Sequence, residues 1–385
     1  MTPEQRSDAI LNFLAKRAQA TTPGGEPQWS VASDFAQAIS ASVDRTSIFR
    51  DLQRLVEVGL VEAHGPTRAR VYRLDPTSRA ALQWELSQPP EARHKVEYNP
   101  QILRNYQPNH TSWLSAAQKQ ALLDACHTGI DAVDPDAYRV VMNNLLIDLS
   151  YASSRLEDVQ ISWIDTKSLI EFNTRPEGLT DKEYRIVVNH KEAIQFICEN
   201  RADLGLSRRD ILDVHRLLSA GLLGNPADEG RVRQSIVYFT ESAYRPISVP
   251  SVLDEEFRLY CEKASQIEDP FEAAMFSMAM IPYLQPFQDG NKRTSRLSMN
   301  IPLLSRSLAP FSFTQIDRRD YVFGLLAFYE RGRTEFLADA FVAGYARSAP
   351  KYAELMAAIS RGATVSSVDA DAAEIRRPGR ACREC

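Results

Sequence analysis

Apolar residues recur every three to four positions over most of this chain, which is the spacing of one buried face of an α-helix. From about residue 113 to 356 the pattern predicts one helix after another, and the clearest segments are 115–130, 136–158, 180–202, 207–223 and 251–267. Residues 233–250 differ, because β-branched and aromatic residues flank a central turn there and predict a β-hairpin. The predicted fold class is therefore mainly α, a helical core with a small β-hairpin.

Residues 1–75 predict a separate small unit. A helix over 6–19 is followed by a helix–turn–helix pattern over 31–61 and by two alternating segments around a Gly65–Pro66 turn. This order resembles winged-helix DNA-binding domains, in which the second helix of the helix–turn–helix enters the major groove. The resemblance implies DNA contacts from basic side chains of this unit, for which the candidates are Arg45, Arg50, Arg54, Arg68, Arg70 and Arg73.

Charge gives the DNA-binding hypothesis limited support. Between 45 and 73 there are six Arg against three acidic residues, but over 1–75 nine basic residues balance nine acidic ones. A winged helix that serves protein contacts or dimerisation therefore remains an alternative.

Chain length and local composition predict the domain organisation. A chain of 385 residues exceeds the roughly 250–300 residues at which single cores stop growing, so we expect more than one domain. Residues 76–110 are rich in Pro and polar residues and predict a connector, 111–356 form the helical core, and 357–385 lack an apolar period and predict a disordered tail.

The spacing of the cysteines and the hydropathy of the chain indicate the cellular compartment to expect. Five Cys are scattered along the chain without a disulfide framework, and the CxxC of Cys382 and Cys385 stands alone in the polar tail, where a metal or redox role is the less favoured interpretation. No apolar run approaches the ~20 residues of a membrane helix, and net charge is −5. We expect a cytoplasmic protein.

The stretch "YLQPFQDGNKRTSR" at 283–296 carries the clearest chemistry. It connects two predicted helices. The first begins with Asp269 as its N-cap and Pro270 at its first position, and it carries a buried stripe of Phe271, Met275, Met278 and Ile281. The second is a single helix marked by Leu297, Ile301, Leu304 and Leu308.

The end of the stretch forms the first turns of this second helix, where unpaired N–H groups bind phosphate. Gly290 permits close approach of a ligand to the backbone, and Asp289 offers the hard oxygen that a phosphate-bound Mg²⁺ uses. Asn291, Arg293 and Arg296 add donors, so these residues predict a cradle for a magnesium polyphosphate.

This stretch resembles the signature loop of the Fic (Fido) family, His-x-Phe-x-Asp/Glu-Gly-Asn-x-Arg-x-x-Arg, in a helical core. Family members typically transfer AMP from ATP to a Ser, Thr or Tyr hydroxyl of a target protein. "GRVRQSIVYF" at 230–239 resembles the family's flap, which registers the target segment by strand addition, and "SSRLED" at 153–158 resembles its inhibitory-helix pattern, with a departure at Asp158. The likeness covers about 95–350.

The resemblance implies a role for each matching residue. Asp289 holds Mg²⁺, Gly290 and Asn291 line the anion hole, and Arg293 and Arg296 neutralise the outer phosphates of ATP. An inhibitory helix near 142–158 places Glu157 against Arg296. Further implied site residues are Phe287 and Lys292 in the nucleotide loop, Ser153 in the inhibitory helix, and Gly230, Arg233, Ile236 and Val237 in the flap.

Two positions within the signature loop also depart from the family pattern. Gln285 stands where the family has its catalytic His, and an amide cannot take a proton as a general base, a step that typically contributes ~10²–10⁴-fold. Lys292 stands where AMP-transferring members often have Gly, and Doc toxins, which phosphorylate their target, also carry Asn-Lys-Arg. The Gln is consistent with a binding-only protein, an altered transferase or an engineered substitution, and we favour a natural replacement.

Three hypotheses follow. The first is an ATP- and magnesium-binding adenylyltransferase restrained by Glu157, with weakened chemistry at Gln285. The second is a DNA-binding regulator that uses the Fic core as a nucleotide sensor, and the third is a Doc-like phosphoryl transferase. We expect a protein target, no membrane, and a homodimer. His190 and His215 lie among apolar neighbours and are interpreted as packing histidines.

Overall fold

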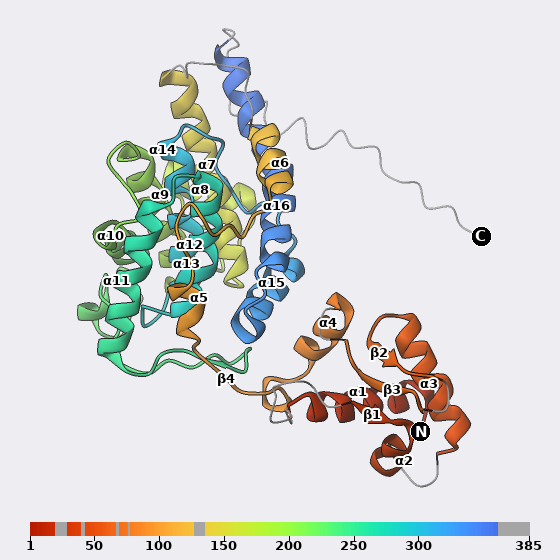
Figure 1. Cartoon of the computed structure of the whole chain (residues 1–385). Helices are drawn as coiled ribbons and strands as arrows, with labels where there is room; N and C mark the ends of the chain where they lie inside the picture. The colour runs from red at the N-terminus through yellow and green to blue at the C-terminus, as the bar shows by residue number, and fades with distance from the viewer. Residues whose placement is uncertain (20–28, 40–42, 67–68, 76–77, 127–134, 361–385) are drawn as a thin grey trace. The chain divides into compact units, whose positions relative to one another are not determined.

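In the computed structural model, residues 1–19, 29–39, 43–66, 69–75, 78–126 and 135–360 are described. The chain divides into two units: one comprises Met1–Val96 with Phe239–Tyr244, and the other comprises Glu97–Tyr238 with the chain from Arg245 onward. Figure 1 shows the elements of each unit, and the two are described separately.

The N-terminal unit has the element order that the sequence predicts, with one additional strand. Strands β2 and β3 form an antiparallel hairpin, in which Val61 faces Leu74, and β1 pairs with the other edge of β3. Leu11, Phe35 and Leu52 belong to the core between helices and sheet. The elements are α1 (Pro3–Gln19), β1 (Ser30–Val31), α2 (Ala32–Ile39), α3 (Arg45–Glu57), β2 (Val61–His64), β3 (Val71–Leu74), α4 (Arg79–Ser87) and a 3₁₀ turn η2 (Pro90–Ala92).

Two local features of this unit have clear causes. Gly59 follows α3 with φ of +70°, the left-handed conformation that the sequence predicts for a helix C-terminus. The segment predicted as a connector contains α4, because Ser78 caps its N-terminus by accepting from the Ala81 N–H, and Leu82 and Leu86 are buried on one face. The described part of the predicted connector, residues 78–110, thus contains regular structure.

The second unit is helical. Its long helices match the five segments predicted from apolar spacing, with ends that differ by a few residues. They are α5 (Pro100–Arg104), α6 (Ala116–Cys126), α7 (Pro135–Leu156), α8 (Trp163–Phe172), α9 (Asp181–Glu199), α10 (Arg208–Ser219), a 3₁₀ turn η3 (Pro226–Asp228), α11 (Pro250–Gln266), α12 (Pro270–Leu284), α13 (Asn291–Ser298), α14 (Ile301–Ser305), α15 (Arg318–Arg331) and α16 (Glu335–Ser360).

Helix α12 lies at the centre of this unit, surrounded by other helices (Figure 1). Every residue from Phe271 to Leu284 is buried, including the polar Glu272 and Ser277, so the predicted apolar stripe is part of a helix that is buried on all sides. Asp269 caps the helix by accepting from the N–H groups of Phe271 and Glu272, and Pro270 occupies its first position, as the sequence predicts.

A proline near the end of α12 fixes where α13 packs. Pro282 has no N–H to donate to the carbonyl of Met278, one turn earlier. The hydroxyl of Ser295 on α13 donates to this carbonyl instead, at 3.0 Å. The Met278 carbonyl, which has no N–H partner at position 282 of α12, therefore forms a hydrogen bond to α13. This bond fastens α13, and the loop before it, to α12.

The structure corrects two predictions in this unit. Within 233–250 only β5 (Tyr244–Arg245) is in a strand ladder, and it pairs with β4 (Val96–Glu97), so the segment is not a hairpin. The single helix predicted over Leu297–Leu308 is divided at Met299–Asn300 into α13 and α14, and Leu308 lies beyond both. Asn300 serves the bend, because its side chain donates to the Phe311 carbonyl and accepts from the Phe311 N–H.

The predicted disordered tail begins at 357, but residues 357–360 belong to helix α16, so the helix extends beyond the predicted boundary. Three predictions concern residues outside those that the structure describes, namely the tail over 361–385, the Cys382/Cys385 pair and Arg68. Among the described helices, none is long and apolar enough to span a membrane.

Candidate functional site

The loop between α12 and α13 is anchored through its aromatic residue. Phe287 is fully buried, and its ring stacks on the imidazole of His215 from α10, with centroids 3.7 Å apart and planes 4° from parallel. Gly290 then begins α13 with φ of +80°, a conformation that L side chains rarely adopt. The chain thereby turns into α13 with the backbone of its first turn facing the loop.

Gln285 belongs to the loop's internal framework. It ends α12 in the left-handed conformation, with φ of 50°. Its side-chain nitrogen donates to the Pro282 carbonyl at 2.8 Å, and its side-chain oxygen accepts from Asn291 Nδ2 at 2.9 Å. Asn291 in turn accepts from the Phe287 N–H and donates to the Phe287 carbonyl, both at 2.9 Å. Both side-chain amides thus hold the loop, and the anion-hole role of Asn291 stays a prediction.

Arg296 projects from α13 toward α7 and is buried. Its Nη2 donates to Glu157 Oε1 at 2.6 Å and to the Ser153 carbonyl at 3.3 Å, while its Nε donates to Ser153 Oγ at 2.9 Å. The sequence-predicted pairing of Glu157 with Arg296 is therefore present in the structure, with Ser153 as a second partner of the guanidinium.

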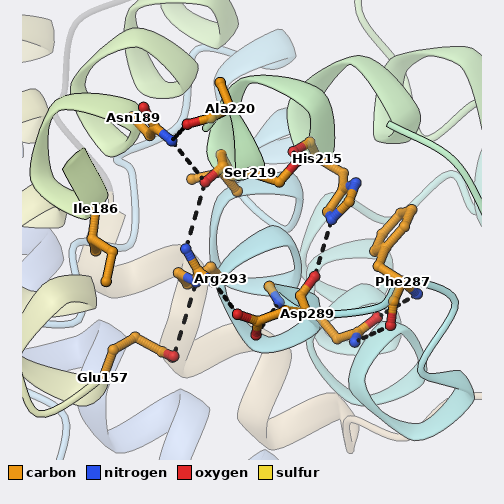
Figure 2. A network of polar contacts seen from close by, with 12 residues as sticks. Glu157, Ile186, Asn189, His215, Ser219, Ala220, Phe287, Asp289 and Arg293 are labelled. Carbon is orange, nitrogen blue, oxygen red and sulfur yellow. Dashed lines mark hydrogen bonds and ion pairs between the residues drawn. The ribbon is translucent and has the colours of Figure 1, made fainter. Parts of the chain in front are cut away.

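Arg293 lies on the same face of α13, three residues before Arg296. Its Nη2 contacts Asp289 Oδ2 at 3.1 Å, and its Nε lies 3.9 Å from Glu157 Oε2, beyond hydrogen-bond distance (Figure 2). This buried Nε has no hydrogen-bond partner within the described part of the chain. Arg293 Nη1 reaches the Leu218 carbonyl at 3.5 Å, at the end of α10.

The Glu157 carboxylate lies between the guanidinium groups of Arg293 and Arg296. Burial alone would raise its pKa, but the positive charges of Arg296 and Arg293, with a smaller effect of Lys292, lower the pKa to about 2. The carboxylate is therefore ionised at neutral pH. Its side chain is 25% exposed, which leaves one side of the ion pair open to solvent.

His215 joins the loop to the segment after α10. The Gly230 N–H donates to His215 Nδ1 at 3.0 Å, so Nδ1 carries no proton, and Nε2–H donates to the Asp289 carbonyl at 3.0 Å. Burial lowers the pKa of His215 to about 4, and the bond to Asp289 offsets this only in part. The residue interpreted as a packing histidine is thus also a polar link between two parts of the site.

The predicted flap residues have two different environments. Gly230, with φ of +69°, and Arg233 are turned inward, and Arg233 donates to the carbonyls of Gln285, Ser235 and Ile247 at 2.6–2.7 Å. Ile236 is 51% exposed and Val237 half-buried. Arg233 therefore fastens this segment to the loop between α12 and α13, while Ile236 is exposed.

Comparison with known proteins identifies the domain. Residues 205–303, which contain α10, the loop and α13, match the model of the Fic/DOC family. The chain contains a Fic domain. It is 25% identical over 177 residues to a protein adenylyltransferase Fic of Nematostella vectensis, covering 44% of this chain and 40% of the relative, and 25% identical over 193 residues to protein adenylyltransferase fic-1 of Caenorhabditis elegans, covering 48% and 37%.

Solved structures show the same fold. A Fic-1 fragment from C. elegans superposes with a TM-score of 0.51 at 20% identity, covering 62% of this chain and 72% of that one. A Fic-domain signaling protein from Bacteroides thetaiotaomicron gives 0.50 at 18% identity, covering 65% and 100%. The chain spans about two fifths of the length of the curated adenylyltransferases it matches.

The structure brings most of the predicted residues of the Fic domain together, and it adds two. Gln285, Phe287, Asp289, Gly290 and the side chains of α13 surround the start of that helix, and Ser153 and Glu157 reach it from α7. His190 on α9 and His215 on α10 belong to the same network but were assigned only to packing. A signal was available for each, since a histidine among apolar positions of a helix has polar atoms that must be satisfied.

Proposed function

We propose that the Fic domain binds ATP at the start of α13 and is a protein adenylyltransferase whose site is restrained by Glu157. The observation that carries the proposal is the position of the Glu157 carboxylate between Arg293 and Arg296. Two buried guanidiniums require an anionic partner, and a phosphate satisfies them as well as a carboxylate does. The outer phosphates of ATP would therefore replace Glu157, and Glu157 would oppose them by occupying the same charges.

Magnesium fits this proposal through a single carboxylate. Asp289 is 55% exposed, so one of its oxygens can reach a ligand while the other pairs with Arg293. Among the described residues no group of three or more metal-ligating side chains gathers. Mg²⁺ is commonly held by one or two carboxylates together with substrate phosphates, where it neutralises charge on the transferred group. Asp289 would hold it in this way, with the nucleotide supplying the remaining oxygens.

Gln285 limits the chemistry that follows binding. Its side-chain amide has no proton-accepting nitrogen, and both of its polar atoms bond within the loop. AMP transfer forms a bond from the target hydroxyl oxygen to the α-phosphorus and releases pyrophosphate, while the hydroxyl proton must go to a base. Since Gln285 cannot be that base, we infer that this Fic domain transfers AMP slowly even when its nucleotide is bound.

Calorimetry with ATP and Mg²⁺ tests the binding step. Glu157→Gln removes the competing charge with little change in shape, and we expect it to bind ATP at least tenfold more tightly than the natural chain. Asp158→Asn is the matched control, because this neighbouring carboxylate pairs with Arg318, at 2.7 Å, outside the site. If the Glu157→Gln protein shows no heat of ATP binding, the proposal is wrong.

The transferred group distinguishes the adenylyltransferase from the Doc-like alternative. Lys292 places an additional positive charge beside Glu157, which is enough to affect how a nucleotide lies but does not define which phosphorus is attacked. Intact-mass spectrometry of modified target proteins separates the two reactions, since AMP and a phosphate add different masses. A phosphate increment would replace the adenylyltransferase proposal with phosphoryl transfer.

A second candidate function concerns the N-terminal unit. Arg45 and Arg50 on α3 and Arg70 at the start of β3 are exposed, whereas Arg54 is tied to Ser7 at 2.8 Å. We propose that α3 and the β2–β3 hairpin bind DNA through the exposed arginines. Arg50→Ala should weaken retention of DNA in a shift assay and reduce its salt dependence, whereas Arg209→Ala, an exposed arginine on α10, should not. Equal retention by wild type and Arg50→Ala would exclude this function.

A further inference from the structure

Arg296 begins a chain of three hydrogen bonds that does not include Glu157. Arg296 Nε donates to Ser153 Oγ at 2.9 Å, Ser153 Oγ lies 2.8 Å from His190 Nε2, and His190 Nδ1 lies 2.7 Å from the Ile186 carbonyl. Ser153, His190 and Arg296 are all buried. The chain therefore joins α13 to α7 and α7 to α9.

Hydrogen-bond chemistry fixes the direction of every bond in this chain. The Ile186 carbonyl can only accept, so His190 Nδ1 carries the proton. The neutral ring then presents an unprotonated Nε2, which accepts the Ser153 hydroxyl hydrogen. The lone pairs of the Ser153 oxygen are thereby left for Arg296 Nε–H, which can only donate.

The charge state of His190 supports the same arrangement. Burial, together with the positive charges of Arg293 and Arg296, lowers its pKa to about 3. A neutral His190 fits this arrangement, because an imidazolium would add a second donor to Ser153 and a third positive charge beside Arg293 and Arg296.

We propose that His190 is a positioning residue, which acts through Ser153 to hold the Arg296 guanidinium in the orientation that receives the outer phosphate of a nucleoside triphosphate. This inference rests on the proposed function. Glu157 contacts Arg296 only through Nη2, whereas Ser153 holds Nε with its hydroxyl and Nη2 with its carbonyl. When Glu157 is displaced, Arg296 remains held by Ser153, and its Nη2 faces the position that the carboxylate leaves.

The test is a double-mutant cycle in the Glu157→Gln protein, with ATP–Mg²⁺ affinity measured by calorimetry. Ser153→Ala and His190→Phe should each weaken ATP binding by about tenfold, the scale of one hydrogen bond to a charged group. The double variant should be no weaker than the weaker single one, because both substitutions break the same chain. His190→Gln keeps an acceptor for Ser153 and should bind within about twofold of its parent.

Ser154→Ala is the matched control. Ser154 is adjacent to Ser153 and equally buried, and its hydroxyl has no hydrogen-bond partner within the described residues. We expect its ATP affinity to equal that of its parent. The proposal would be overturned if Ser154→Ala weakened ATP binding as much as Ser153→Ala does. It would also be overturned if the losses of ATP affinity multiplied in the double variant, or if His190→Phe kept the full ATP affinity of its parent.

A second measurement does not depend on nucleotide. In a ¹⁵N spectrum of histidine-labelled wild-type protein, His190 should show the Nδ1–H tautomer, and His215, as an internal reference, the opposite Nε2–H tautomer. Ser153→Ala should shift the His190 Nε2 signal and leave that of His215 in place. If Glu157→Gln fails to bind ATP, the proposed function fails, and an Nε2–H tautomer at His190 would overturn the positioning chain itself.

Discussion

Asn291 Nδ2 donates to the side-chain oxygen of Gln285 at 2.9 Å, six residues apart across the loop. This bond requires an acceptor at position 285, and the other end of the same amide donates to the Pro282 carbonyl. The Gln285 amide supplies both the acceptor and the donor from one planar group. A glutamine here therefore gives the loop rigidity at the position where Fic proteins generally have a base.

Restoring a histidine at this position should restore transfer, provided that the site is also open. We expect wild type and Glu157→Gln to label proteins only weakly after incubation with α-labelled ATP, and Glu157→Gln/Gln285→His to label them strongly. The expected gain is about 10²–10⁴-fold, the typical effect of a general base. The measurement is incorporation of label into lysate protein on a gel.

Two controls make the result interpretable. The same incubation with γ-labelled ATP detects phosphoryl transfer, and Gln285→His alone, with Glu157 still paired to Arg296, should remain silent. Strong labelling by Glu157→Gln alone would show that a residue other than position 285 serves as base.

Much of the Fic domain could be predicted from local sequence. These features depend on residues within about one helical turn of each other, as in the cap at Asp269, the apolar run of α12 and the loop that follows it. The pairing of Glu157 with Arg296 spans 139 residues, and it was predicted only because both ends lie in recognisable motifs. The inhibitory role that the resemblance implies for this pair remains a prediction.

The features that sequence did not predict depend on contacts between distant segments. Ser295 bonds to the carbonyl freed by Pro282 only because α13 packs against that turn of α12. His190 faces Ser153 across 37 residues, and no periodicity encodes its hydrogen bonds. The segment after Gly230 reads as a hairpin from β-propensity, but Arg233 ties its backbone to the nucleotide loop instead, and tertiary contacts override propensity.

Asp289 should link nucleotide binding to magnesium. In the Glu157→Gln background, Asp289→Asn removes a carboxylate that would hold the ion, and we expect ATP affinity in Mg²⁺ to fall by about tenfold, to the level seen in EDTA. Asp289→Asn should show the same affinity with and without Mg²⁺, measured by calorimetry. An undiminished response to Mg²⁺ would assign the metal to other ligands.

His215 should be needed for the rigidity of the loop. His215→Phe preserves an aromatic ring to stack on Phe287, but the Gly230 N–H and the Asp289 carbonyl lose their partners. A buried polar group left unsatisfied costs roughly 1–3 kcal/mol, so we expect the free energy of unfolding in urea to fall by about 2 kcal/mol or more. His110→Phe, at an exposed histidine, is the control and should change stability little. A stable His215→Phe protein would mean that stacking alone holds the loop.

His190 should make the protein less stable in mild acid. Its pKa is about 3 in the folded chain and ~6.5 when unfolded, so below pH 6.5 the unfolded state binds one more proton than the folded state. The contribution of His190 to the free energy of unfolding is therefore fully present above pH 6.5. It decreases by about 1.4 kcal/mol per pH unit as the pH falls from 6.5 toward 3. Urea unfolding of wild type and His190→Gln at pH 7 and pH 5 should show a loss about 2 kcal/mol larger in wild type. Because His215 is present in both proteins, its contribution cancels, and equal losses would show that His190 is protonated in the folded chain.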